Sequence, residues 1–151
     1  MTPQEFVSAV GKAARQSMIE TRIPASFVVA DAALESGWGK SLLSVQGFNL
    51  FGVKADSSWK GATLTMQTRE FLNGQWIMVP ALWRKYPDWL ASINDHAQFL
   101  LTNARYSGCF SHKDGIGFAQ AVQSAGYATD PLYGEKIISI INQYKLSNLD
   151  D

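Results

Sequence analysis

The rest of the chain is arranged around the residues Ala32-Ala33-Leu34-Glu35-Ser36-Gly37-Trp38-Gly39-Lys40. The residues just before it are mostly apolar, so we expect a helix that begins near residue 24 and lies at the centre of the fold. Gly37 can adopt the positive φ of a helix C-cap, which places Glu35 in the last turn. The negative end of the helix dipole disfavours ionisation there, and Trp38 can cover the carboxyl group. The sequence therefore predicts a raised pKa for Glu35.

The composition is that of one ordinary globular domain. Of the 151 residues, 46% are hydrophobic and 17% are charged, which is typical of folded rather than disordered chains. This length can bury one core without disulfides or metals. Cys109 is the single cysteine, which excludes an internal disulfide and a zinc site built from cysteines. We expect one domain over residues 1–151 with a buried, inert thiol.

The charge balance excludes some classes of partner. The 13 Lys and Arg residues equal the 13 Asp and Glu residues, so no net charge favours binding to nucleic acid. No segment approaches the roughly 20 apolar residues of a membrane span. The first residues lack the basic and apolar regions of a secretory signal. We therefore expect synthesis in the cytoplasm without a signal peptide, no nucleic-acid partner and no membrane insertion.

Helix signals dominate the remaining sequence. Thr2 and Glu5 have the spacing of a capping box, which predicts a first helix to about residue 17. Asp88 can cap a further helix that carries apolar residues at helical spacing as far as Leu101. A turn-rich segment at residues 102–117 leads to a short helix through residues 118–122, which is expected to end near Gly126. Asp130 and the proline after it predict the N-cap and first position of a last helix.

Two β-like runs interrupt the helical pattern, at residues 63–71 and 75–83. Asn73-Gly74 joins them and is a strong signal for a two-residue hairpin turn. In the first run, Glu70 alternates onto the same face as Leu64 and Met66. Residues 41–61 look loop-like, with one helical turn near residues 41–44. The expected fold is mainly α, of the α+β class, with several helices around a small β hairpin.

Glu35 is the strongest candidate for chemistry. A carboxyl group that stays neutral near pH 7 can donate a proton to a leaving-group oxygen, as the general acid of glycoside cleavage does. Local spacing alone equally allows an ordinary exposed glutamate. A glycosidase usually needs a second polar group across the scissile bond, and Glu70 is the best carboxylate candidate, although a strand-end salt bridge would also explain it.

Other chemistries find little support. His96 and His112 lie in different segments without partners at metal-ligand spacing, so we interpret both as surface or capped histidines and expect no metal. No dinucleotide-binding or phosphate-binding loop is present, and no nucleophile elbow. We expect no cofactor.

An ordered set of motifs runs from about Pro24 to Lys145, nearly the whole chain. After the Glu35 stretch come Asn49-Leu50-Phe51-Gly52-Val53-Lys54-Ala55, Ser58-Trp59-Lys60-Gly61, Thr68-Arg69-Glu70-Phe71, Trp83-Arg84-Lys85-Tyr86, Arg105-Tyr106 and Ala125-Gly126-Tyr127-Ala128-Thr129-Asp130-Pro131. Together they resemble the glucosaminidase domain of the FlgJ family of flagellar peptidoglycan hydrolases and its relatives in glycoside hydrolase family 73.

This resemblance implies a lysozyme-like helical fold in which a β hairpin flanks a glycan-binding groove. It also implies cleavage of the β-1,4 bond after N-acetylglucosamine in the peptidoglycan backbone, which leads to bacterial cell-wall lysis. Glu35 falls on the general acid of the family, Glu70 on its second acidic position, and Tyr127 on an aromatic position beside the acid. The resemblance implies substrate-binding positions at Trp38, Asn49, Phe51 and Trp59. We expect a monomer whose partner is the peptidoglycan glycan strand.

Two alternatives stay open. An N-acetylmuramidase or a lytic transglycosylase on the same fold also uses a glutamate at a helix end, and a glycan-binding or wall-assembly module could be catalytically silent. The flagellar proteins carry a rod-associated domain before the hydrolase domain, whereas here Met1 almost adjoins the first expected helix. We therefore expect a free-standing hydrolase of the bacteriophage endolysin type, which reaches the cell wall after phage-mediated release.

Overall fold

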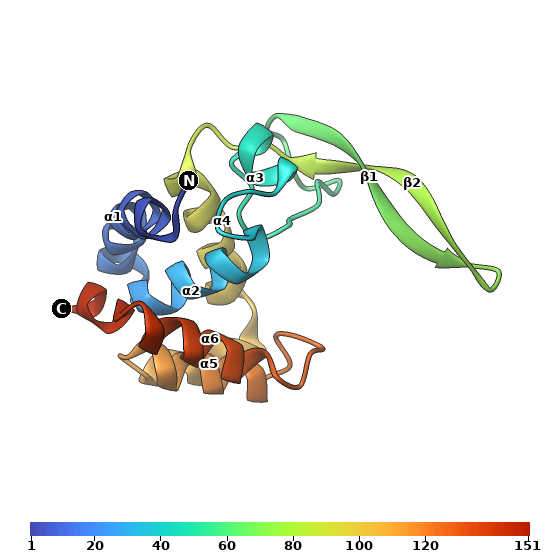
Figure 1. Cartoon of the computed structure of the whole chain (residues 1–151). Helices are drawn as coiled ribbons and strands as arrows, with labels where there is room; N and C mark the ends of the chain where they lie inside the picture. Colours follow the sequence, from blue (N-terminus) through green and yellow to red (C-terminus); the bar gives the residue numbers. More distant parts are fainter.

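The computed structural model describes residues 1–151. The chain folds into a body of packed helices from which one β hairpin projects (Figure 1). The elements follow in the order α1 (Pro3–Thr21), α2 (Ala25–Ser36), α3 (Leu42–Gly47), β1 (Thr63–Leu72), β2 (Gln75–Arg84), α4 (Trp89–Thr102), the 3₁₀ helix η1 (Ala104–Ser111), α5 (Gly115–Ser124), α6 (Tyr133–Gln143) and the 3₁₀ helix η2 (Leu146–Asp150). The expected mainly helical fold with one small hairpin is confirmed.

The first helix begins at the capping box that the sequence predicts. The Thr2 side chain accepts a hydrogen bond from the Glu5 amide, at 3.1 Å, and the Glu5 carboxylate accepts one from the Thr2 amide, at 2.9 Å. These bonds satisfy two amides that would otherwise lack partners at the helix start. α1 continues four residues beyond its expected end and stops where Arg22 adopts a φ of 64°.

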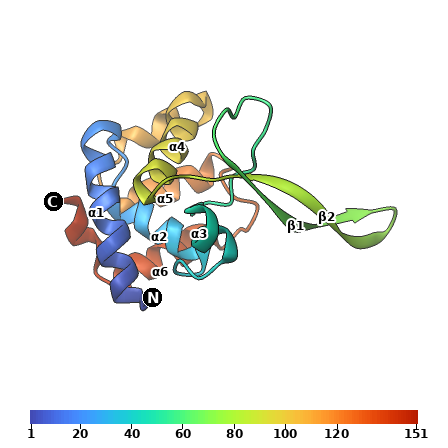
Figure 2. The ribbon, with the colours of Figure 1, turned by 90° about the horizontal axis from the view of Figure 1, so that it is seen from above.

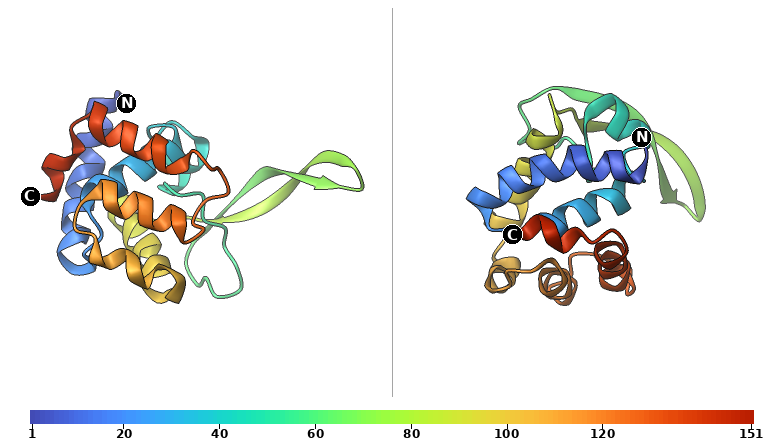
Figure 3. Two further views of the ribbon diagram at one scale, coloured as in Figure 1. Left: turned by 90° about the horizontal axis from the view of Figure 1, so that it is seen from below. Right: turned by 60° about the vertical axis from the view of Figure 1, so that its left-hand side comes forward.

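α2 is the central helix, as expected. Ten of its 12 residues are buried, and it lies between α1 on one side and the α5–α6 pair on the other (Figure 3). Gly37 ends it with a φ of 59° and donates its amide to the Ala33 carbonyl oxygen. This C-cap confirms the position of Glu35 in the last turn of a helix that the core holds on several sides.

One hydrophobic core joins the helices. It contains 24 buried residues, which come from α1, α2, α4, η1, α5, α6 and η2 and from two residues outside them, Ile23 and Leu50. Phe27 of α2 packs on Phe118 of α5, with 4.8 Å between ring centroids. Each such fully buried aromatic side chain contributes roughly 2–3 kcal/mol of transfer free energy. Cys109 belongs to this core at 3% exposure, which agrees with the expected buried thiol.

The hairpin projects from the body and meets it near one end (Figure 2). Its turn residues, Asn73 and Gly74, have φ values of 52° and 78°, the two positive values of the expected tight turn. At the base, the Ala55 amide donates to the Leu82 carbonyl oxygen, and the Arg84 amide donates to that of Val53. The segment after α3 therefore anchors the hairpin.

The predicted start of the last helix is wrong. α6 begins at Tyr133, not at Pro131, and Asp130 does not cap it. The Asp130 side chain accepts hydrogen bonds from the Leu132 amide, at 2.9 Å, and from Lys136 Nζ, at 2.6 Å, which closes a turn ahead of the helix. The helical turn expected near residues 41–44 is the longer α3, capped by Ser41.

None of the helices combines the length and the apolar composition needed to cross a bilayer.

Candidate active site

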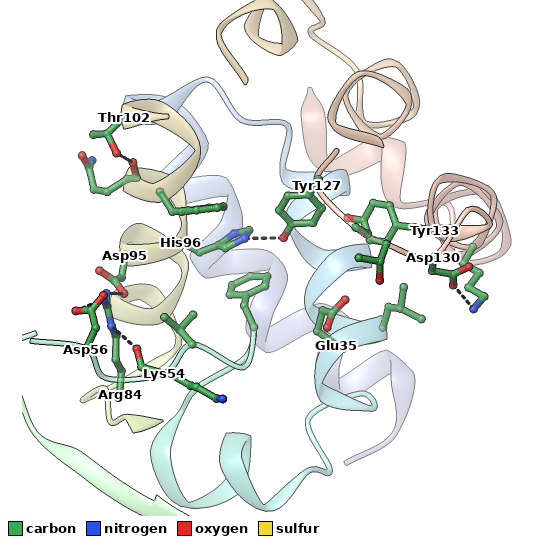
Figure 4. A pocket seen from close by; sticks show the side chains of 18 residues that line it. Glu35, Lys54, Asp56, Arg84, Asp95, His96, Thr102, Tyr127, Asp130 and Tyr133 are labelled. Carbon is green, nitrogen blue, oxygen red and sulfur yellow. Dashed lines mark hydrogen bonds and ion pairs between the residues drawn. The ribbon is translucent and has the colours of Figure 1, made fainter. Parts of the chain in front are cut away.

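A pocket of about 900 Å³ opens where α2, α4 and the loop before α6 meet (Figure 4). This volume is in the range of ligand-binding clefts, which run from roughly 300 to 1,000 Å³. Its walls combine aromatic rings with carboxyl and cationic side chains. The lining includes Glu35, Phe51, Lys54, Asp56, Arg84, Asp95, His96, Phe99, Tyr127, Asp130, Tyr133 and Lys136.

Glu35 reaches this pocket from the last turn of α2. The residue is exposed as a whole, but the surrounding walls partly desolvate its carboxyl group and so raise its pKa above the usual value for glutamate. None of the three ion pairs in the structure involves Glu35. The carboxyl group therefore lies open to a ligand in a setting that favours its protonated form, as predicted.

Asp31 lies one helical turn before Glu35 and is fully buried at 0% exposure. Its carboxylate accepts hydrogen bonds from the hydroxyl groups of Tyr127, at 2.7 Å, and Tyr133, at 2.9 Å. Burial raises its pKa to about 7 although both hydroxyl groups act in the opposite direction. Sequence reasoning missed Asp31, and the available signal was an acidic residue inside an otherwise apolar helix.

His96 of α4 completes this network. Its Nε2 atom lies 2.7 Å from the Tyr127 hydroxyl oxygen, and its ring stacks on Phe51 with 4.0 Å between centroids. The residue is only 8% exposed, so the prediction of a surface histidine is wrong. Burial lowers its pKa to about 4, which makes the ring neutral near pH 7. Its spacing from Ile93 and Leu100 on the apolar face of the helix was the missed signal.

The facing wall of the pocket carries an ionic cluster (Figure 4). Arg84 Nη1 lies 2.8 Å from Asp95 Oδ2, which also accepts a 2.6 Å hydrogen bond from the Tyr86 hydroxyl group. Asp56 lies 3.5 Å from Arg84 Nη2. This cluster ties the end of β2 to α4. No group of three or more metal-ligating side chains lies close together in the chain.

Of the residues predicted for the site, Glu35, Phe51 and Tyr127 share the pocket. Trp38 does not line it, because its ring packs between Phe6, at 5.7 Å, and Tyr144, at 4.7 Å. The Trp38 ring, which follows the end of α2, therefore packs against the core and not in the pocket.

Asn49 and Trp59 also lie outside the pocket lining. Asn49 is 1% exposed, and its side chain bonds only to backbone atoms of Val53 and Arg84. The Trp59 ring lies 4.8 Å from the Arg84 guanidinium group, and its Nε1 donates to the Ala62 carbonyl oxygen at 2.8 Å. Both contacts support the loop and the hairpin base.

Glu70 lies on β1, opposite Ile77 of β2. It is half-buried on the less exposed face of the hairpin, as the alternation in the sequence predicts. It takes part in none of the three ion pairs, and it is not among the residues that line the pocket. The structure therefore does not bring Glu70 together with Glu35.

Comparison with known sequences places this geometry in context. Residues 11–146 match the family described as glucosaminidase, mannosyl-glycoprotein endo-beta-N-acetylglucosaminidase. Peptidoglycan hydrolase FlgJ from Salmonella typhimurium is 38% identical over 146 residues, which cover 94% of this chain and 46% of that protein. Exo-glucosaminidase LytG from Bacillus subtilis is 34% identical, over 98% of this chain and 54% of that protein. The chain spans about half the length of these curated relatives.

Comparison with solved structures supports the same grouping. The C-terminally truncated glycoside hydrolase domain of Salmonella typhimurium FlgJ superposes with a TM-score of 0.83 at 36% identity. The match covers 95% of this chain and 98% of that one. The helical body with one projecting hairpin is therefore the fold of a solved glycoside hydrolase domain.

Proposed function

Because this chain belongs to the glucosaminidase family, we propose that it hydrolyses the β-1,4 bond after N-acetylglucosamine in the peptidoglycan glycan strand. The observation that carries the proposal is the Glu35 carboxyl group, partly desolvated at a helix end and open to a pocket large enough for sugar rings. The bacterial cell wall is then the place where the protein acts.

In the proposed reaction, Glu35 acts as the general acid. Its protonated carboxyl group donates a proton to the glycosidic oxygen as the bond to the anomeric carbon breaks. Phe51 and Phe99 offer apolar ring surface in the pocket for the carbon faces of the sugars. Tyr127 presents its ring to the same pocket, while its hydroxyl group is engaged by Asp31 and His96.

Glu70 is proposed to act from the hairpin as the second carboxylate, which assists the attack of water or stabilises positive charge at the anomeric carbon. This role requires the hairpin to bend at its base toward Glu35 when glycan binds, because Glu70 lies outside the pocket lining. The hairpin meets the body at its base, through hydrogen bonds at residues 53–55 and 82–86 and through the contact of β1 with α3, so it can bend there as a unit. If the hairpin does not bend, the N-acetyl group of the substrate would have to take the role of the second carboxylate at the anomeric carbon.

The test is an analysis of reaction products. Purified peptidoglycan is digested, reduced with borohydride and examined by mass spectrometry. We expect reduced N-acetylglucosamine ends. Reduced N-acetylmuramic acid ends would identify a muramidase, anhydro ends would identify a lytic transglycosylase, and either result would overturn the proposed bond. No new ends of any kind would identify a binding module.

Matched variants test the two carboxylates. Glu35→Gln keeps the shape of the side chain but cannot donate an acidic proton, so we expect the rate of end formation to fall by about 10²–10⁴-fold. Glu70→Gln should lower kcat by a smaller factor and leave the bond specificity unchanged. Wild-type rates in Glu35→Gln would contradict the general acid, and wild-type rates in Glu70→Gln would contradict only the second carboxylate.

A further inference from the structure

Asp31 is a buried carboxyl group that the proposed reaction does not use. It has no exposed surface, and its three polar neighbours form one connected network with it: Tyr127, Tyr133 and, through Tyr127, His96. Tyr127 lies 96 residues away along the chain and Tyr133 lies 102 residues away. Burial of a carboxyl group without a cationic partner costs free energy of folding. The position of Asp31 directly behind the pocket therefore suggests that it has a function there.

We propose that Asp31 is a positioning residue for the Glu35 site: it holds the Tyr127 ring in the pocket wall, and its charge acts on the Glu35 carboxyl group one helical turn away. This role rests on the proposed function of Glu35 as the general acid. Residues four apart on a helix are neighbours, with their Cβ atoms roughly 6 Å apart. The carboxyl groups of Asp31 and Glu35 therefore extend from neighbouring positions on one side of α2. The charge of Glu35 is among the causes that raise the pKa of Asp31, whereas burial is the cause at Glu35. A Coulomb interaction between two groups nevertheless acts on both of them.

The network can satisfy both charge states of Asp31. With the carboxylate ionised, His96 Nε2–H donates to the Tyr127 oxygen, and Tyr127 donates to Asp31. With the carboxyl group protonated, Asp31 donates to the Tyr127 oxygen, and Tyr127 donates to an unprotonated His96 Nε2. Tyr133 donates to the other carboxyl oxygen in both cases. The position of Tyr127 is therefore kept while the charge behind Glu35 changes.

Few other titratable groups face this pair. The loop before α6 contributes Tyr127, α6 contributes Tyr133, and α4 contributes His96. Tyr106 of η1 packs on the Tyr127 ring, at 6.0 Å between centroids.

Most of the remaining charges nearby are paired or lie elsewhere, and Lys54 is a pocket-lining cation that forms no ion pair. Asp95 and Asp130 bind Arg84 and Lys136 in ion pairs. On η2, Asp150 bonds to Ser26 at the opposite end of α2. No cation forms an ion pair with Asp31 or Glu35, so a change in the charge of one carboxyl group acts on the other without a fixed counter-charge.

The activity test compares kcat/KM of wild type and Asp31→Asn between pH 5 and 9. Asparagine keeps the shape and can still accept from Tyr133 and donate to Tyr127, but it carries no charge. Where Asp31 is protonated, the ratio of wild-type to variant kcat/KM should be constant. As Asp31 ionises, the ratio should rise by about threefold to tenfold to a second plateau, the effect of a like charge roughly 6 Å away at an effective dielectric constant of about 40–80.

The matched control is Val29→Ala, which removes buried methyl groups from the same helix without altering any charge. The ratio of wild-type to Val29→Ala kcat/KM should stay constant across the same pH range. A constant ratio for Asp31→Asn as well would show a purely structural role and overturn the proposal.

A second measurement needs neither an Asp31 variant nor catalysis. The carboxyl carbon of Asp31 is titrated by NMR in wild type and in Glu35→Gln. Because coupling between two sites is reciprocal, the midpoint of Asp31 should fall by about 0.5–1 pH unit when the charge of Glu35 is removed. An unchanged midpoint would overturn the proposal, whatever the activity of the protein. Absence of peptidoglycan cleavage together with a shifted midpoint would refute the proposed function while the coupling stands.

Discussion

The side-chain amide of Asn49 donates a 2.8 Å hydrogen bond to the backbone carbonyl oxygen of Arg84, which ties the loop after α3 to the last residue of β2. The same amide nitrogen donates to the Val53 carbonyl oxygen at 2.9 Å, and Asn49 Oδ1 accepts from the Val53 amide at 3.0 Å. Asn49 is 1% exposed, so water cannot replace these bonds. One side chain thus sets the path of the loop that carries Phe51 into the pocket.

Asn49→Ala should lower the free energy of unfolding by about 2–4 kcal/mol, because it leaves backbone groups of Val53 and Arg84 buried without partners. Urea denaturation followed by circular dichroism measures this change. Asn142→Ala is the control, since Asn142 is exposed on α6, and its effect should stay within about 0.5 kcal/mol. Equal effects of the two substitutions would contradict the role of Asn49.

Two glycines after α2 should respond differently to alanine. Gly37 has a φ of 59° and open space around its Cα, so Gly37→Ala should cost about 1–2 kcal/mol from backbone strain alone. Gly39 has a φ of 78°, and an added Cβ would lie 3.1 Å from a ring carbon of Phe6. Gly39→Ala should therefore cost more, about 2–4 kcal/mol. Thermal unfolding of both variants provides the measurement, and a smaller cost at Gly39 would refute the argument.

Asp31 and His96 should make opposite contributions to the pH dependence of stability. Burial raises the pKa of Asp31 from 3.8 to about 7, so the folded state binds more protons than the unfolded state in that range, and stability falls as pH rises. Burial lowers the pKa of His96 from 6.5 to about 4, so the folded state binds fewer protons there, and stability rises with pH. Between about pH 4 and 6.5 the two contributions offset each other.

Single substitutions should expose these slopes. Between pH 4.5 and 6, the unfolding free energy of Asp31→Asn should rise relative to wild type by about 1.4 kcal/mol per pH unit, and that of His96→Gln should fall by a similar amount. Urea denaturation of the wild type and both variants at several pH values gives the two slopes. The other titratable groups contribute equally to the wild type and to each variant, so they cancel in the difference. Slopes of the same sign in the two variants would contradict the assignment.

Local signals made most of the fold predictable. The Thr2–Glu5 capping box and the Asn73-Gly74 turn act within a few residues, so the helix start and the hairpin follow from the sequence alone. Asp130 shows the limit of such signals. An aspartate before a proline suits both an N-cap and a turn ahead of a helix, and here its bonds to Leu132 and Lys136 select the turn.

The site was only partly predictable for a different reason. Glu35 stands at a helix end that its own neighbours define, and the family resemblance pointed to Phe51 and Tyr127. Asp31 and His96 lie in apolar helical patterns, and their partner Tyr127 is 96 and 31 residues away, so no local pattern shows the network. A motif match likewise cannot separate a ring that lines a pocket from one that packs in the core.

The hairpin of β1 and β2 is joined to the body only at its base. Its two strands pair with each other, residue by residue, from Thr63–Arg84 to Leu72–Gln75. Such local pairing forms without the long-range contacts that assemble the helical core. The strands therefore constitute a separate cooperative unit, able to open and close while α2 stays folded. We therefore expect the amides around Glu35 to exchange with solvent more slowly than those around Glu70.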